Sequence, residues 1–108
     1  MKTALLLLVL LAGCGSARRG EPLAGAFLPA DDSEQHGQAL FADHCYKCHP
    51  GGEAGLGPAL NDKPLPVFLM RLQVRRGLGA MPSFSDEALS DEELDDLLEF
   101  VVALRRHG

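Results

Sequence analysis

The sequence predicts an all-α domain, and three observations lead to this prediction. Apolar residues recur at intervals of three and four in the segments 33–45, 67–76 and 90–104, as they do on one face of an α-helix. Stretches rich in glycine and proline separate these segments, and such stretches form loops. In residues 67–74, where a strand is the alternative, period-two alternation is poor. The 108 residues suffice for one small domain.

The first helix is expected to begin at Ser33, a good N-cap residue, and to run to about Cys45. Glu34 in its first turn suits the helix dipole. Residues at helical spacing share one face, and these are Gly37, Leu40, Phe41, His44, Cys45 and Cys48. The two cysteines are therefore expected on the same side as the apolar residues.

The second helix is expected over residues 67–76, between a proline and a glycine. Pro66 suits the first position of a helix, and Gly77 suits its end. Residues 50–62 and 77–86 on either side read as loops from their turn residues. Within the second loop, Pro82 favours an extended backbone at Met81.

The last helix is expected to begin at Ser90, because Glu93 follows three residues later and completes a capping box. Its carboxylates crowd the N-terminal half and its arginines the C-terminal end, as the helix dipole favours. The residues expected to line its buried side are Leu94, Leu97, Leu98, Val101 and Leu104.

The start of the chain has the pattern of an export signal. Lys2 precedes an apolar run of nine residues, 4–12, which is too short for a membrane span of about 20 residues. The run ends in Leu11-Ala12-Gly13-Cys14, which resembles the lipobox of bacterial lipoproteins. We therefore expect a signal peptide at 1–13, a lipid-bearing Cys14 and a flexible tether at 14–32. An ordinary signal peptide, or a tail packed on the domain through Phe27, remains the alternative.

The segment Cys45-Tyr46-Lys47-Cys48-His49 carries the chemistry. Cys-x-x-Cys-His is the attachment signature of c-type haem, because two thiols at this spacing reach the two haem vinyl groups. A zinc ribbon would need a second Cys-x-x-Cys pair, and a thioredoxin-like site would need a βαβ context. The sequence predicts one covalent haem c on Cys45 and Cys48.

With this motif in place, residues 34–105 resemble the class I cytochrome c family. The stretch between the haem motif and Met81 is short, as in small bacterial members of the family. Four motifs occur in the family's order, and the haem segment is one of them. The others are Gly57-Pro58-Ala59-Leu60, Gly79-Ala80-Met81-Pro82 and the last helix with Phe100. The resemblance implies a cytochrome c fold of three to four helices around the haem at 33–108.

The resemblance also assigns roles to single residues. His49 would be the proximal iron ligand, with its Nδ1–H donated to the carbonyl of Pro58. Met81 would be the distal ligand, which raises the reduction potential. Gly37, Phe41 and Phe100 would form the crossing of the first and last helices.

Other candidates for the iron are left open by the residues themselves. Met70 is the rival distal ligand, although its place inside a helix favours core filling. His36 and His44 offer bis-histidine ligation, although both belong to the first helix. Three basic residues of the second helix are expected either to neutralise haem propionates, to mark a docking surface or to complement the helix end, and these are Arg71, Arg75 and Arg76.

The function that follows is electron transfer. With both axial positions filled, iron has no site for substrate, so a carrier is expected rather than an enzyme. Its partners would be redox proteins and, through Cys14, a bacterial membrane on the periplasmic side. The net charge of −5 argues against nucleic acid. The alternatives are a fixed haem subunit of a larger complex and a haem-based sensor or peroxidase-like enzyme.

Overall fold

The fold is helical, as predicted. A computed structural model describes residues 26–62 and 64–107. In these residues it has three α-helices, α2 (Asp32–His44), α3 (Val67–Arg76) and α4 (Asp91–His107), and one 3₁₀ turn, η1 (Pro50–Gly52). The signal peptide at 1–13, Cys14 and most of the tether expected at 14–32 lie outside the described residues. Within the described part, no helix is both long and apolar enough to span a bilayer.

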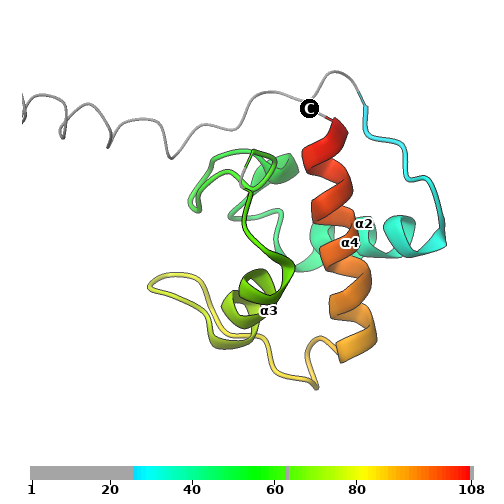
Figure 1. Ribbon diagram of the computed structural model, residues 1–108. Coiled ribbons are helices and arrows are strands. Elements are labelled where there is room, and N and C mark those ends of the chain that lie inside the picture. The colour runs from blue at the N-terminus through cyan, green and yellow to red at the C-terminus, as the bar shows by residue number, and fades with distance from the viewer. Residues whose placement is uncertain (1–25, 63, 108) are drawn as a thin grey trace, which may run out of the picture.

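The crossing of α2 with α4 is the largest contact between elements (Figure 1). Gly37 makes it possible, because a Cβ at this position would overlap the backbone carbonyl of Asp96 and would lie 2.9 Å from the Cβ of Phe100. The rings of Phe41 and Phe100 meet beside it, with centroids 5.2 Å apart. The crossing expected from Gly37, Phe41 and Phe100 is therefore confirmed.

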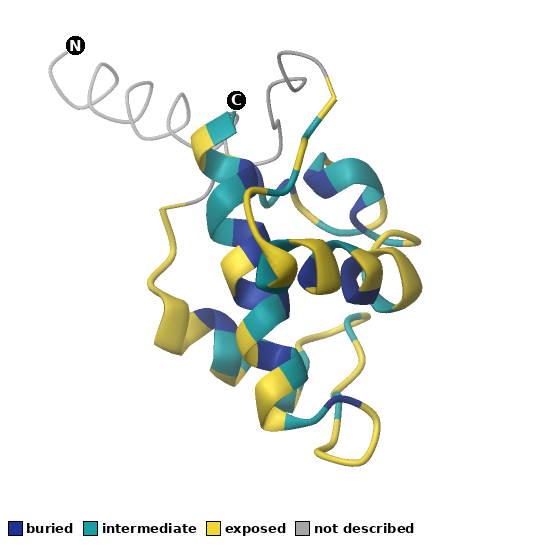
Figure 2. Ribbon diagram, turned by 90° about the vertical axis from the view of Figure 1, so that its right-hand side faces the viewer, coloured by how far each residue is buried: buried dark blue, intermediate teal, exposed yellow. Residues whose placement is uncertain are grey.

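Helix α4 forms the centre of the core, and Figure 2 shows buried residues recurring along it. Every residue expected on its inner side is buried, namely Leu94, Leu97, Leu98, Val101 and Leu104. Ser90 Oγ accepts the amide of Glu93 at 3.2 Å, so the predicted cap at the start of this helix is present. Helix α3 packs on α4 less extensively and buries only Met70 among its residues.

The start of α2 differs from the prediction. Asp31, and not Ser33, is the N-cap, because its carboxylate accepts the amide of Glu34 at 2.8 Å. The carboxylate of Glu34 reaches back to accept the amide of Ala30 at 2.8 Å. Two N-terminal amides are thereby satisfied, which an N-cap at Ser33 would not achieve. The helix ends as predicted beside the haem motif, with Cys45 as its C-cap.

The part of the predicted tether that precedes α2 is packed. Phe27 meets the ring of Phe100 edge-on at 5.3 Å and the ring of His107 at 5.4 Å. It is half-buried against the hydrophobic core. At Phe27 the chain therefore follows the alternative of a packed tail, because an aromatic side chain gains more from the apolar end of α4 than from water.

Candidate functional site

An apolar cavity of about 310 Å³ opens between α3, α4 and the two loops. This volume lies at the lower end of the range for ligand pockets. The carboxyl-terminal end of α2 and the start of the haem motif complete its wall. The cavity is lined by Phe41, Cys45, His49, Pro58, Ala59, Leu60, Leu65, Met70, Gln73, Val74, Leu78, Met81, Leu97, Leu98, Val101 and Arg105.

The imidazole of His49 is held in one orientation. It is 7% exposed, and its Nδ1 lies 2.8 Å from the carbonyl oxygen of Pro58. Because a carbonyl only accepts, Nδ1 carries the proton and Nε2 keeps its lone pair, which is the form that binds a metal. Gly57 packs so closely on the ring that a Cβ there would lie 2.8 Å from both nitrogens. The hydrogen bond expected between His49 and Pro58 is present.

The two cysteines of the motif lie together beside this imidazole. Both are free thiols, and the amides of Cys48 and His49 both bond the carbonyl of Cys45, at 3.2 and 2.9 Å. Burial, and secondly the proximity of Cys48, raises the pKa of Cys45 to about 11. Such a thiol is poorly suited to carry a thiolate charge. Once Cys45 is joined to haem as a thioether, its sulfur is uncharged, and burial carries no penalty for it.

Met81 reaches the same cavity from a tight turn. The amide of Met81 donates to the carbonyl of Leu78 at 3.0 Å, and the amide of Leu78 donates to the carbonyl of Met81 at 3.1 Å. Gly77 ends α3 with φ of 69°, a left-handed conformation that glycine adopts without strain. The amide of Phe84 bonds the carbonyl of Val74 at 2.9 Å and ties the end of the loop back to α3.

Gln73 is a polar neighbour of Met81 that the sequence did not single out. Its Nε2 lies 3.8 Å from Sδ of Met81 and donates to it. The sequence signal that could have identified Gln73 is its position in the last turn of α3, eight residues before Met81. Met70 also lines the cavity, but it is buried in the core cluster.

The histidines of α2 have other contacts. Nδ1 of His36 lies 2.7 Å from Oδ2 of Asp96 and so connects α2 to α4. The ring of His44 packs edge-on against Phe84, with centroids 5.7 Å apart. Neither histidine is among the residues that line the cavity.

The basic residues of α3 are directed away from the cavity. Arg71 pairs with Asp95 of α4. Arg75 donates to the carbonyls of Leu89 and Phe84, at 2.6 and 3.3 Å, and to Oδ1 of Asp91 at 2.7 Å. Because Arg71 and Arg75 are engaged in this way, the expectation that they neutralise haem propionates is not supported. Arg75 instead connects α3 to the end of the loop that carries Met81 (residues 77–86, the methionine loop) and to the start of α4.

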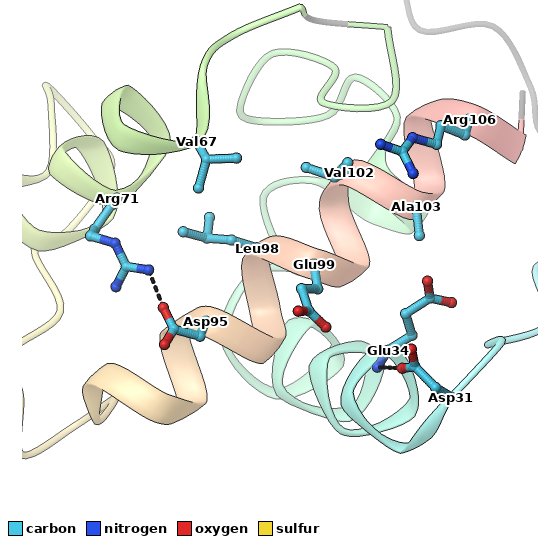
Figure 3. A pocket seen from close by; sticks show the side chains of 10 residues that line it. All are labelled: Asp31, Glu34, Val67, Arg71, Asp95, Leu98, Glu99, Val102, Ala103 and Arg106. Atoms are coloured by element: carbon cyan, nitrogen blue, oxygen red, sulfur yellow. Dashed lines mark hydrogen bonds and ion pairs between the residues drawn. The ribbon is translucent and has the colours of Figure 1, made fainter.

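A larger concavity, of about 550 Å³, lies over the outer side of α4 (Figure 3). Four carboxylates and two arginines line it around a small apolar floor, and the pair of Arg71 and Asp95 stands at one side. Its described lining residues include no cysteine, histidine or methionine. In residues 26–62 and 64–107, no three side chains of His, Cys, Asp or Glu come together as a metal site. Haem chemistry therefore belongs to the apolar cavity.

The cavity fits a haem on the evidence of its own residues. Its walls are mostly apolar, Cys45 of the two motif cysteines lines it, and its histidine offers Nε2 from a fixed ring. Fold and site together define a haem protein of the c type.

Comparison with known proteins gives the family. The family described as cytochrome c oxidase, cbb3-type, subunit III matches residues 32–101. Cytochrome c6 of Cyanidioschyzon merolae is 35% identical over 81 residues, which cover 68% of this chain and 76% of that protein. The cytochrome c subunit of 4-cresol dehydrogenase [hydroxylating] of Pseudomonas putida is 35% identical over 75 residues, which cover 69% and 66%.

A third relative, cytochrome c6 of Synechocystis, is 32% identical over 81 residues, which cover 68% of this chain and 67% of that protein. No solved structure gave a significant match. The chain belongs to the class I monohaem cytochrome c family. It carries one haem c, bound covalently through Cys45 and Cys48, and its function is electron transfer.

Proposed function

We propose that this cytochrome is a membrane-tethered carrier whose haem iron is held between His49 and Met81. The observation that carries the proposal is that both side chains line one apolar cavity, His49 from the haem motif and Met81 from the loop after α3. Bound haem supplies a one-electron couple between ferric and ferrous iron. The chain holds the imidazole by its hydrogen bond to Pro58 and the thioether by the tight turn at Leu78.

With two protein ligands the iron has no open position, so an electron carrier is favoured over an enzyme. The same ligands would serve both oxidation states, and little would rearrange when the electron moves. The Met81 thioether favours the reduced iron and so raises the potential. The apolar walls exclude water, which acts in the same direction by destabilising the extra charge of ferric haem.

Replacement of the two methionines tests the ligation. In Met81→Ala the sulfur-to-iron charge-transfer band of the ferric protein should disappear, the reduction potential should fall and the ferrous protein should bind carbon monoxide. Met70→Leu is the matched control, because Met70 lines the same cavity and leucine nearly conserves its volume. Loss of the band in Met70→Leu, or ready binding of carbon monoxide by the wild type, would refute the proposed ligation.

The membrane tether rests on the lipobox-like segment that ends at Cys14. Two or more acyl chains at the amino terminus would anchor the protein stably on the periplasmic side of a bacterial membrane. Cys14→Ser should move the haem protein from the membrane fraction to the soluble fraction without change in its spectrum. If the Cys14→Ser protein stays with the membrane, the anchor lies elsewhere.

A second candidate is a fixed haem subunit of a larger complex. It is favoured by the relative that is the cytochrome subunit of a dehydrogenase, and by the exposed side chains of Phe68 and Leu72 on α3. Phe68 is 69% exposed, which is unusual for a large aromatic residue and suits a buried interface. Gel filtration of the detergent-extracted protein separates the two, because a free carrier elutes alone.

A further inference from the structure

The haem cavity contains an arginine that none of the assigned roles explains. Arg105 lies near the end of α4, where its charge suits the helix dipole. Its side chain nevertheless turns inward. Among the described residues that line the cavity, Arg105 is the one guanidinium, and the lining includes no carboxylate.

The guanidinium of Arg105 is surrounded by neutral acceptors. Nη1 donates to the carbonyl of Leu65 at 2.9 Å, Nε lies 3.4 Å from the carbonyl of Leu60, and Nη2 faces the sulfur of Met70. None of these described partners is a carboxylate. Burial holds the pKa of Arg105 below its usual range. The charge of Arg105 is thus partly desolvated and has neutral partners, so an anion that enters the cavity beside it would be stabilised.

The other basic residues nearby already have different surroundings. Arg71 pairs with Asp95, and Arg75 donates to Asp91 and to two carbonyls. Arg106, the residue after Arg105, lines the concavity on the outer side of α4 and not the haem cavity. Of the arginines in the described part of the chain, Arg105 is therefore the one that lines the haem cavity.

Haem brings the missing anion, because it carries two propionate groups on one edge of an otherwise apolar ring. A planar guanidinium pairs with a carboxylate through two parallel hydrogen bonds, which is the strongest common ion pair of this kind. We propose that Arg105 binds a haem propionate and so would supply the counter-charge that this carboxylate needs inside the cavity. The carbonyl bonds to Leu60 and Leu65 hold the guanidinium in place for this contact.

This role makes Arg105 a determinant of the reduction potential. Its positive charge, together with the neutralisation of the propionate, favours the ferrous state over the ferric state, since the ferric haem carries one more positive charge. The proposal depends on covalent haem at Cys45 and Cys48, which family membership establishes, and not on the identity of the distal ligand or on the lipid anchor.

A set of three variants in the holoprotein tests the proposal. Arg105→Gln retains an amide donor for the loop carbonyls but removes the charge. It should lower the midpoint potential and shift the propionate bending mode in the resonance Raman spectrum. Arg105→Lys keeps the charge but loses the planar pair of donors, so its potential should stay near that of the wild type while the propionate mode shifts. Arg106→Gln, which removes a charge from the same turn of α4, should change neither.

Two results would overturn the assignment. One is a wild-type propionate mode in Arg105→Gln, because an arginine that only clamps the loop affects stability and not the propionate. The other is an equal shift of mode and potential in Arg106→Gln, which would reduce the effect to surface charge. If Arg105→Gln does not accumulate as folded protein, the propionate bending mode of Arg105→Lys serves as the test. A wild-type frequency of this mode in Arg105→Lys would then refute the proposal.

Discussion

Replacement of Arg75 by leucine is expected to loosen the methionine loop. Arg75 is 18% exposed and fastens residues 84–91 to α3 through two backbone carbonyls and the carboxylate of Asp91. Leucine keeps most of the apolar stem but removes these three contacts and the longer ion pair with Asp86, at 3.5 Å to an 82% exposed carboxylate that adds little. If Met81 is the distal ligand, the loop that carries it will then leave the iron more often.

The size of the effect can be worked out from the contacts. A hydrogen bond from a charged donor contributes about 1.5–3 kcal/mol, and the bond to Leu89 at 2.6 Å is the strong one. The bond to Phe84, at 3.3 Å, is weak. Asp91 is 75% exposed, so its ion pair adds at most about 1 kcal/mol. The sum is about 2–4 kcal/mol, equal to an increase of about 30- to 700-fold in the open state of the loop.

The assay is imidazole binding to the ferric protein, because an iron ligated by Met81, as proposed, takes up imidazole only when Met81 leaves. Affinity should rise in Arg75→Leu by up to this factor, and the midpoint of urea unfolding should fall. Arg76→Leu is the control, since Arg76 is the next residue, is exposed and makes none of these contacts. Lower stability without a change in imidazole affinity, or an equal gain in Arg76→Leu, would refute the reasoning.

Three further substitutions test the fold and the proximal side. Asp31→Ala should lower the free energy of unfolding by about 1 kcal/mol in urea titration, with Ser33→Ala nearly neutral; the reverse order would contradict the observed N-cap. Gly37→Ala should destabilise by about 1–3 kcal/mol in the same titration, because its Cβ overlaps α4, and a neutral result would mean that the helices are not so close. Gly57→Ala should push against the His49 ring and reduce the yield of attached haem with an altered ferric spectrum, whereas a wild-type spectrum would show that the ring has room.

The local elements of the fold were predictable because their signals are local. Ser90 with Glu93, and Gly77 after a helical segment, mark helix ends by hydrogen bonds and backbone angles that span only a few residues. The start of α2 was predicted two residues late because Asp31, Asp32 and Ser33 are all good caps, and only the observed hydrogen bond selects one.

Contacts between distant residues were harder to predict. The sequence marks Phe27 as a residue that can pack on the domain, but its place against Phe100 depends on the direction in which the chain enters α2. The arginines show the same difficulty. Arg71 and Arg75 share a helix face in the sequence, yet Asp95 and the carbonyls of the methionine loop are brought to them only by the packing of α3 on α4.

By itself, the sequence determined that a haem is attached at Cys45 and Cys48, that His49 follows it, and that helices lie on either side. These properties depend on covalent spacing and on periods of a few residues. Only the tertiary structure decided that Arg105, rather than an arginine of α3, points into the haem cavity. The reason is physical, because the direction of a side chain at a helix end is set by the loop carbonyls that happen to lie across from it, and these come from residues forty positions or more away.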